Sequence, residues 1–281
     1  MNPTLARFLC GVLPFAVSSL PVGVPAQGMP PVVDRNNLYS EAGAGKFSPA
    51  VADALPRAYV PNLQTNDVYV IDPATRKVID KFRVGINPQH IVPSSDLKTL
   101  WVTNNAEGRT DGTLTPIAKG GMPQDIRVSP DGKIFFVADM MADGVHVVDG
   151  ASFTRIDFVK SGVGSHGLYP SRDGMKLYVA NRGINKIHGV PGGKGSVSVI
   201  DFATRKVEAN WPIPGGGSPD MGNVSGDGKV LWLSGRYDNV VYAIDTTSGE
   251  VTKIPVGKEP HGLTVWPQPG RYSLGHTGNM R

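Results

Sequence analysis

The stretch from Ala58 to Asn104 decides the fold of this chain: AYVPN at residues 58–62, NDVYVIDPATRKV at 66–78, FRVG at 82–85, PQH at 88–90 and LWVTN at 100–104. Its last five residues repeat the pattern with which it begins, an aromatic residue and a valine followed by an asparagine. Tyr59 and Trp101 lie 42 residues apart. The stretch is therefore one unit of a sequence repeat.

The aromatic signal returns along the rest of the chain, at Phe136, Tyr178 and Trp232, after intervals of 35, 42 and 54 residues. Two further signals accompany it. An alternating segment ends in aspartate at 68–72, 145–149, 197–201 and 240–245, and a Ser-x-Asp-Gly turn stands at 129–132, 171–174 and 225–228. Periods of this length, built from short strands without a helical pattern, predict a β-propeller.

We expect an all-β fold with about five blades, each a four-stranded antiparallel sheet. The innermost strands are predicted at 89–92, 124–129, 166–169, 221–225 and 261–266, and the fourth strands at 77–84, 152–159, 206–213 and 250–256. The aromatic residue of each second strand is expected to wedge between neighbouring blades. The first unit lacks an innermost strand, so the C-terminal strand should complete the N-terminal blade and remove the open edges.

The N-terminal region divides into two segments before the propeller domain at 58–281. Residues 1–26 have the features of a secretory signal: Arg7, an apolar stretch at 8–24 and small residues that predict cleavage after Ala26. Residues 27–57 are rich in proline, glycine and alanine and predict an extended lead-in. We therefore expect a secreted, periplasmic or cell-envelope protein without a stable membrane span after cleavage.

Composition narrows the chemistry further. The only cysteine, Cys10, lies in the predicted signal, which excludes disulfides and cysteine-based catalysis from the mature chain. The formal charge of +4 comes from scattered basic residues and indicates a solvated surface rather than a nucleic-acid footprint. Repeated aspartates are predicted to cap turns rather than to catalyse: Asp72, Asp131, Asp173, Asp201, Asp227 and Asp245.

These units resemble the YVTN-repeat β-propeller family of secreted and cell-surface proteins, which is related in fold to the propellers of nitrous oxide reductase and haem d1 nitrite reductase. Trp101-Val-Thr-Asn104 is close to the motif that names the family. The resemblance implies seven blades, whereas the sequence shows about five. The short interval between Trp101 and Phe136 suggests an internal deletion at Ile117 and Ala118, where a third-strand pattern passes directly into a first-strand pattern.

The candidate site is the end of the blades where fourth strands lead into innermost strands. One potential ligand per blade is expected to point toward the axis, and further polar residues reach the same face from the second-to-third connections. The predicted ligand-binding face consists of His90, Asp125, His166, Asp220, His261, Asn104, Asn181, Arg182 and Arg236. A wet channel lining is the simpler interpretation of the same residues.

Several functions remain open at this stage. The first is a monomeric, non-enzymatic propeller that binds a small molecule, glycan or protein partner at this face. The second is a metal- or cofactor-dependent oxidoreductase, lyase or lactonase that uses His90, His166 and His261 as ligands of Zn, Cu or Fe, because imidazole suits these metals. A weaker third is single-stranded nucleic-acid binding through Arg182, Arg236 and Lys186.

Overall fold

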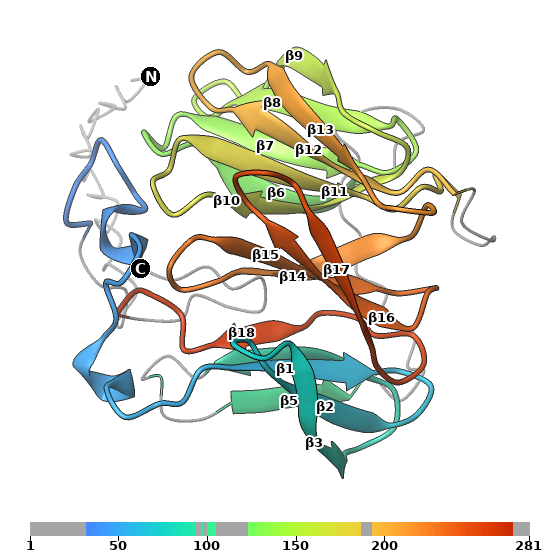
Figure 1. Cartoon of the computed structure of the whole chain (residues 1–281). Helices are drawn as coiled ribbons and strands as arrows, with labels where there is room; N and C mark the ends of the chain where they lie inside the picture. The colour runs from blue at the N-terminus through green and yellow to red at the C-terminus, as the bar shows by residue number, and fades with distance from the viewer. Residues whose placement is uncertain (1–31, 94–96, 98–99, 105–122, 187–192, 272–281) are drawn as a thin grey trace, which may run out of the picture. The chain divides into compact units, whose positions relative to one another are not determined.

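A computed structural model describes residues 32–93, 97, 100–104, 123–186 and 193–271. These residues form five antiparallel sheets and only two short 3-10 turns (Figure 1). Four sheets have four strands each, and the fifth has two strands among the described residues. The chain is a β-propeller, and the number of sheets agrees with the repeats counted in the sequence.

The five sheets follow one another along the chain, except for the first, which takes a strand from each end. The bounds of its strands, in sheet order, are β18 (Thr264–Trp266), β1 (Arg57–Asn62), β2 (Asp67–Asp72) and β3 (Lys77–Arg83). The two-stranded sheet contains β4 (Pro88–Pro93) and β5 (Leu100–Asn104). The segment 105–122, with the suspected deletion at Ile117 and Ala118, lies outside the described residues, so the deletion stays a prediction.

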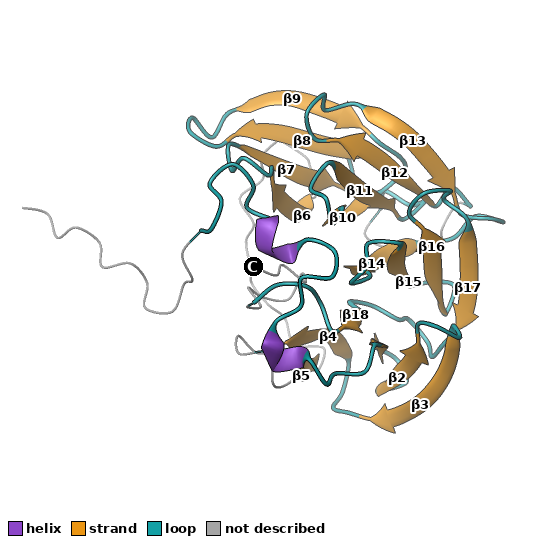
Figure 2. Ribbon diagram, turned by 60° about the vertical axis from the view of Figure 1, so that its left-hand side comes forward, coloured by secondary structure: helices purple, strands orange, loops and turns teal. Residues whose placement is uncertain are grey.

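The other three sheets are complete blades. One contains β6 (Pro123–Val128), β7 (Ile134–Asp139), β8 (Gly144–Asp149) and β9 (Arg155–Lys160). The next contains β10 (Ser165–Pro170), β11 (Lys176–Asn181), β12 (Ser196–Asp201) and β13 (Val207–Pro212). The last contains β14 (Pro219–Val224), β15 (Val230–Gly235), β16 (Val240–Asp245) and β17 (Val251–Pro255). Figure 2 shows β6, β10, β14, β18 and β4 on the inner side of the sheets and β9, β13, β17 and β3 on the outer side.

The C-terminal strand completes the N-terminal blade, as predicted. β18 pairs antiparallel with β1 through Arg57 opposite Trp266 and Tyr59 opposite Thr264. β1 therefore has a hydrogen-bonded neighbour on each side, because β2 pairs with its other edge. This closure leaves β1 protected from pairing with another chain.

Aromatic residues of the second strands are buried between blades, which confirms their predicted role. Phe136 packs in a cluster with Leu168 and Leu177 of the following blade. Trp232 packs in a cluster with Ala58 and Val265 of the N-terminal blade. Burying side chains of this size contributes about 2 to 3 kcal/mol each, so these contacts are a main source of cohesion between blades.

The repeated aspartates cap turns, as the sequence predicts. In the Ser-x-Asp-Gly turns the serine hydroxyl donates to the aspartate, for example Ser129 to Asp131 at 2.6 Å. In the Asp-x-x-Thr/Ser turns the carboxylate accepts from backbone amides, for example from Thr247 and Ser248 to Asp245 at 2.9 and 2.8 Å. All of these turns lie at one end of the blades, which we call the turn end.

The lead-in is more ordered than its composition indicates. Residues 34–56, which we call the strap, contain η1 (Ser40–Ala42) and η2 (Pro49–Val51) and lie against the turn end. The strap amides of Leu38 and Gly45 donate to the carbonyl oxygens of Pro130 and Gly226, at 2.8 and 3.2 Å. These turns belong to different blades, so the strap connects them.

Candidate functional site at the mouth end

The predicted ligands lie where the inner strands begin, at the end opposite the turns, which we call the mouth end. The pairing register shifts at the start of four inner strands, between Pro88 and His90, Pro123 and Asp125, Ser165 and Leu168, and Pro219 and Gly222. Each irregularity adds a residue to the inner strand relative to its partner and turns the side chains there out of the regular alternation. In four of the five blades a recurrent backbone feature thus lies at the predicted polar position.

Asp220 is the centre of the cluster at the mouth end. Its carboxylate is completely buried and lies 2.8 Å from His166 Nδ1, 3.8 Å from His261 Nε2 and 3.9 Å from Arg182 Nε. These four side chains come from β14, β10, the loop before β18 and the end of β11. We call them, together with His90, the mouth cluster.

The histidines of the mouth cluster are close to one another. The ring of His90 meets that of His261 edge to face, with centroids 5.2 Å apart and an interplanar angle of 69°. His261 precedes β18 rather than beginning it, and its backbone amide donates to the carbonyl oxygen of Pro61 at 3.1 Å. The structure therefore brings together all three of the predicted histidines.

Burial and nearby charges together set the protonation states of Asp220 and His261. Burial opposes the ionisation of Asp220, but the facing His166, Arg182 and His261 outweigh it and hold the pKa of this carboxyl well below its usual range. Burial lowers the pKa of His261 to about 3, against the attraction of Asp220 and with the added repulsion of Arg236. At neutral pH the site therefore holds an ionised carboxylate beside a neutral imidazole.

Several buried polar atoms in this region lack an aligned hydrogen-bond partner among the described residues. They are Asp220 Oδ1 and Oδ2, His166 Nδ1, Arg182 Nε and Arg236 Nε. His166 approaches Asp220 closely enough for a hydrogen bond but not in the alignment of one. Buried polar atoms are rarely left without a partner in native proteins, so such a concentration indicates a place for water or a bound molecule.

Two arginines and a tyrosine form the rim of this site. The guanidinium of Arg182 lies 5.3 Å from the ring centroid of Tyr237, and that of Arg236 lies 5.6 Å from it. Arg182 also donates to the hydroxyl of Tyr237 at 2.9 Å, and Arg236 Nε lies 3.8 Å from a carboxylate oxygen of Glu259. Tyr237 thus holds both guanidinium groups beside the mouth cluster.

Asp125 occupies the corresponding position in its blade but has a different environment. Its carboxylate accepts hydrogen bonds from Arg127 Nη1 at 2.6 Å and from the backbone amides of Ile126 and Leu168 at 2.8 and 2.9 Å. The bond to Leu168 joins β6 to the neighbouring inner strand β10. Sequence reasoning missed Arg127, although its position two residues after Asp125 on a strand places both side chains on one face.

Of the two predicted asparagines, Asn181 contacts residues of its own blade rather than the mouth cluster. Asn181 is fully buried, and its side-chain amide donates to the hydroxyls of Ser196 and Ser198 at 3.2 and 3.0 Å. Its hydrogen bonds therefore stabilise its own blade. Asn104 ends β5, but its side chain lies outside the described part of the structure.

The described residues contain no group of three or more histidine, cysteine, aspartate or glutamate side chains arranged to hold a metal ion. His146, which sequence reasoning placed outside the site, is buried on β8 beside Asp139, with Nε2 3.1 Å from Oδ2. His188 and His276 lie outside the described residues. In the described ranges no helix is long and apolar enough to cross a membrane.

Comparison with known proteins identifies a family. The model of the YNCE-like β-propellers matches residues 114–269, which is 156 of 281 residues. No curated protein sequence matches the chain significantly.

The solved structures that match the chain are distant in sequence. Apo AztD from Citrobacter koseri shares 9% identity at a TM-score of 0.49, and the alignment covers 78% of this chain and 98% of that one. The Cps50 (Swd1) β-propeller domain of Myceliophteria thermophila shares 12% identity at a TM-score of 0.40, with 72% and 71% covered. Hydrazine synthase of Kuenenia stuttgartiensis shares 16% identity at a TM-score of 0.30, with 76% and 86% covered.

Proposed function

The chain belongs to the YNCE-like β-propeller family, and on that premise we propose that it is an exported binding protein that holds a small polyhydroxylated molecule, such as a sugar, at the mouth cluster. The proposal rests chiefly on the buried polar atoms around Asp220 that have no aligned partner among the described residues. A ligand hydroxyl donates a proton to one group and accepts from another. It therefore suits a site that contains both a carboxylate and guanidinium and imidazole nitrogens.

Distances support this choice of ligand. Arg182 Nε and His261 Nε2 both face Asp220 Oδ2, at 3.9 and 3.8 Å, which is too long for direct hydrogen bonds. An oxygen that bridges such atoms accepts from the nitrogens and donates to the carboxylate. A purely anionic ligand would meet repulsion from Asp220, and a purely cationic ligand would meet repulsion from Arg182 and Arg236.

Calorimetric titration with a panel of monosaccharides and polyols tests the proposal. We expect at least one of them to bind the wild type, and Asp220→Asn to weaken that binding at least about tenfold, because a charged hydrogen bond contributes about 1.5 to 3 kcal/mol. Asp245→Asn, a change at a carboxylate of the turn end, serves as the matched control and should leave binding unchanged. Absence of binding across the panel, or equal affinity in Asp220→Asn, would contradict the proposal.

A metal-dependent enzyme is the second candidate. The neutral state of His261 beside His90 favours it, since neutral imidazole is the form that ligates metals. The experiment is metal analysis of the purified mature protein. Stoichiometric Zn, Cu or Fe that disappears in the double variant His166→Ala, His261→Ala would support this function, and protein that is metal-free and unaffected by chelators would exclude it.

Export remains part of the proposal. We propose that residues 1–26 direct secretion and are removed, that 27–57 form the lead-in and that 58–281 act as a monomeric propeller domain. N-terminal sequencing of protein recovered outside the cytoplasm should then begin at Gln27. A mature protein that retains residues 1–26 would refute this assignment.

A further inference from the structure

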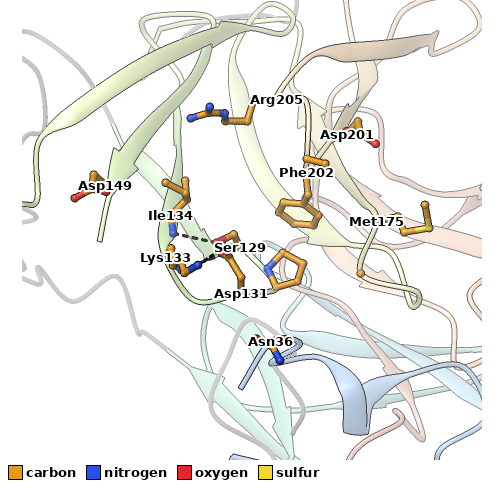
Figure 3. Close-up of a pocket in the computed structure, with 13 residues that line it drawn as sticks. Asn36, Ser129, Asp131, Lys133, Ile134, Asp149, Met175, Asp201, Phe202 and Arg205 are labelled. Atoms are coloured by element: carbon orange, nitrogen blue, oxygen red, sulfur yellow. Dashed lines mark hydrogen bonds and ion pairs between the residues drawn. The ribbon is translucent and has the colours of Figure 1, made fainter. Parts of the chain in front are cut away.

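A cavity lies at the turn end, between the sheets β6–β9 and β10–β13 (Figure 3). We call it the blade cleft. Its volume is about 560 Å³, which is within the usual range of about 300 to 1,000 Å³ for ligand sites. It lies at the end of the blades opposite the mouth cluster and does not depend on the function proposed there.

The interior of the blade cleft is apolar. Figure 3 shows the ring of Phe202 projecting into it, with Ile134 on the facing sheet. Phe136 meets Phe202 edge to face, with centroids 5.3 Å apart and an interplanar angle of 76°. Met175, which is 58% exposed, adds a flexible wall. Such a surface matches an aromatic ring.

An equivalent cleft between β14–β17 and the N-terminal sheet shows which group fits there. Its turn residues Ser225-Gly226-Asp227 stand where the blade cleft has Ser129-Pro130-Asp131. Phe47 of the strap lines this second cleft and lies against Gly226, where an added Cβ would come within 2.6 Å of Phe47 Cζ. The chain thus places an aromatic side chain of its own in a cleft of this kind.

The strap places no aromatic side chain among the described residues that line the blade cleft. It makes the corresponding backbone hydrogen bond, from Leu38 to Pro130, but the strap residue that lines the cavity is Asn36. The blade cleft is accordingly the larger of the two, at about 560 Å³ against about 360 Å³.

The opening of the blade cleft also has an unused hydrogen-bond donor. Arg205 follows the turn at Asp201 as Arg76 follows the turn at Asp72. Arg76 donates to the hydroxyl of Thr252 at 2.6 Å, whereas the guanidinium of Arg205 has no hydrogen bond or ion pair with any residue that the structure describes. It is available to an acceptor on a ligand.

The charges around the opening indicate what accompanies the aromatic group. Three carboxylates line it, Asp131, Asp149 and Asp201, against two cations, Lys133 and Arg205. Asp131 lies 3.8 Å from Lys133 and Asp201 lies 3.6 Å from Lys176, whereas Asp149 has no ion pair among the described residues and favours a ligand with a basic group beside its ring. The strap has that combination, because Lys46 precedes Phe47.

We propose that the blade cleft is a docking site for an extended peptide segment of a partner protein. The segment inserts one aromatic side chain against Phe202, presents a backbone carbonyl to Arg205 and has a basic residue next to the aromatic one. The segment thus places its aromatic side chain in the blade cleft as the strap places Phe47 in the equivalent cleft.

The probe for this proposal is the peptide acetyl-Gly-Lys-Phe-Ser-amide, which copies residues 45–48, and its control has alanine in place of phenylalanine. NMR spectra of the full mature chain should show saturable shifts at Ile134 and Phe202 with the first peptide only. Ala203→Trp, an exposed substitution at the edge of the cleft, should abolish these shifts. Ala74→Trp, the same change at the equivalent cleft, should preserve them.

Arg205→Gln provides a second variant that does not fill the cavity. It should weaken peptide binding about threefold or more, in line with the loss of one hydrogen bond. Absence of shifts at Ile134 and Phe202, equal shifts with the alanine peptide, or shifts that persist in Ala203→Trp would each overturn the proposal. Shifts that vanish only in Ala74→Trp would place the peptide in the other cleft and would also overturn it.

Discussion

Two aspartates at corresponding positions of different blades show how a site residue differs from a structural one. Every described partner of Asp125 is a well-placed donor, and one of them joins two inner strands. Asp220 is also buried but faces its neighbours without aligned hydrogen bonds. The carboxylate of Asp125 therefore stabilises the fold, whereas that of Asp220 is placed to bind a water molecule or a ligand.

We predict that Asp220→Asn destabilises the protein at pH 7 by about 2 to 3 kcal/mol, because it leaves the buried Arg182 without its facing charge. The pKa of Asp220 is lowered by folding, so its stabilisation is complete above the unfolded pKa of about 3.9 and is lost as the pH falls through the folded pKa. Urea unfolding at a series of pH values should therefore show the two proteins converging below about pH 4.

The control for this series is Asp53→Asn, which should change stability little, since Asp53 is an exposed residue. Equal stability of wild type and Asp220→Asn at pH 7 would show that the charges of the mouth cluster do not support the fold.

At this scale the sequence predicts much of the site. One potential ligand per blade at the fourth-to-first connection is visible from the repeat, and the structure brings His90, His166, Asp220 and His261 together. The sequence does not show that Asp125 has a structural role and Asp220 a ligand-binding one. The difference depends on which residues donate hydrogen bonds to each carboxylate, and one such donor to Asp125 is the amide of Leu168, 43 positions away.

Among the elements, four inner strands have a shift in register at their start and pack closely against their neighbours. Gly222 of β14 lies against the neighbouring strand so closely that an added Cβ would come within 1.8 Å of the carbonyl oxygen of Trp232. A side chain at this position would force β14 and β15 apart where their register shifts.

Gly222→Ala should accordingly destabilise the protein by about 3 kcal/mol, as overpacking against backbone cannot be relieved by a rotamer change. Chemical denaturation would measure the loss. Gly43→Ala is the matched control, because the nearest atom to a Cβ there is 3.6 Å away, in ordinary contact. Similar denaturation midpoints for the two variants would show that β14 shifts enough to accommodate the added methyl group.

The elements themselves are predictable because each has a local signal. Alternation, aromatic positions and Asp-Gly turns place the outer three strands of each unit within a few residues of their observed bounds. The register shifts of the inner strands have no such signal, since the glycines and prolines that permit them also occur in ordinary turns. Their presence at the ligand positions is apparent only from strand pairing.

For the molecule as a whole, the strap adds contacts between blades that the sequence repeat does not predict. Its Tyr39 hydroxyl donates to the carbonyl oxygen of Val128 at 2.8 Å, and burial raises the pKa of Tyr39 to about 12. Composition describes this segment as an extended lead-in, because contacts to distant turns such as Pro130 leave no periodic pattern in the strap itself.

The strap should therefore make stability sensitive to alkali. Folded Tyr39 keeps its proton up to about pH 12, whereas an unfolded tyrosine loses it near pH 10, so this residue's contribution falls as the pH rises between these values. Tyr39→Phe should cost about 1 kcal/mol at pH 7 through the lost hydrogen bond. It should also flatten the alkaline decline when unfolding is followed from pH 9 to 12. An unchanged decline would assign it to other tyrosines.

The register shifts at the start of the inner strands have a consequence for how such a propeller can change its ligand. In two blades the shift leaves the ligand residue, His166 or Asp220, outside the regular ladder, so that residue can be exchanged without altering the pairing that holds its blade. The residues at such positions can then be substituted independently of one another. A single substitution at His166 should therefore change the ligand preference of the mouth end while the strand pairing is kept.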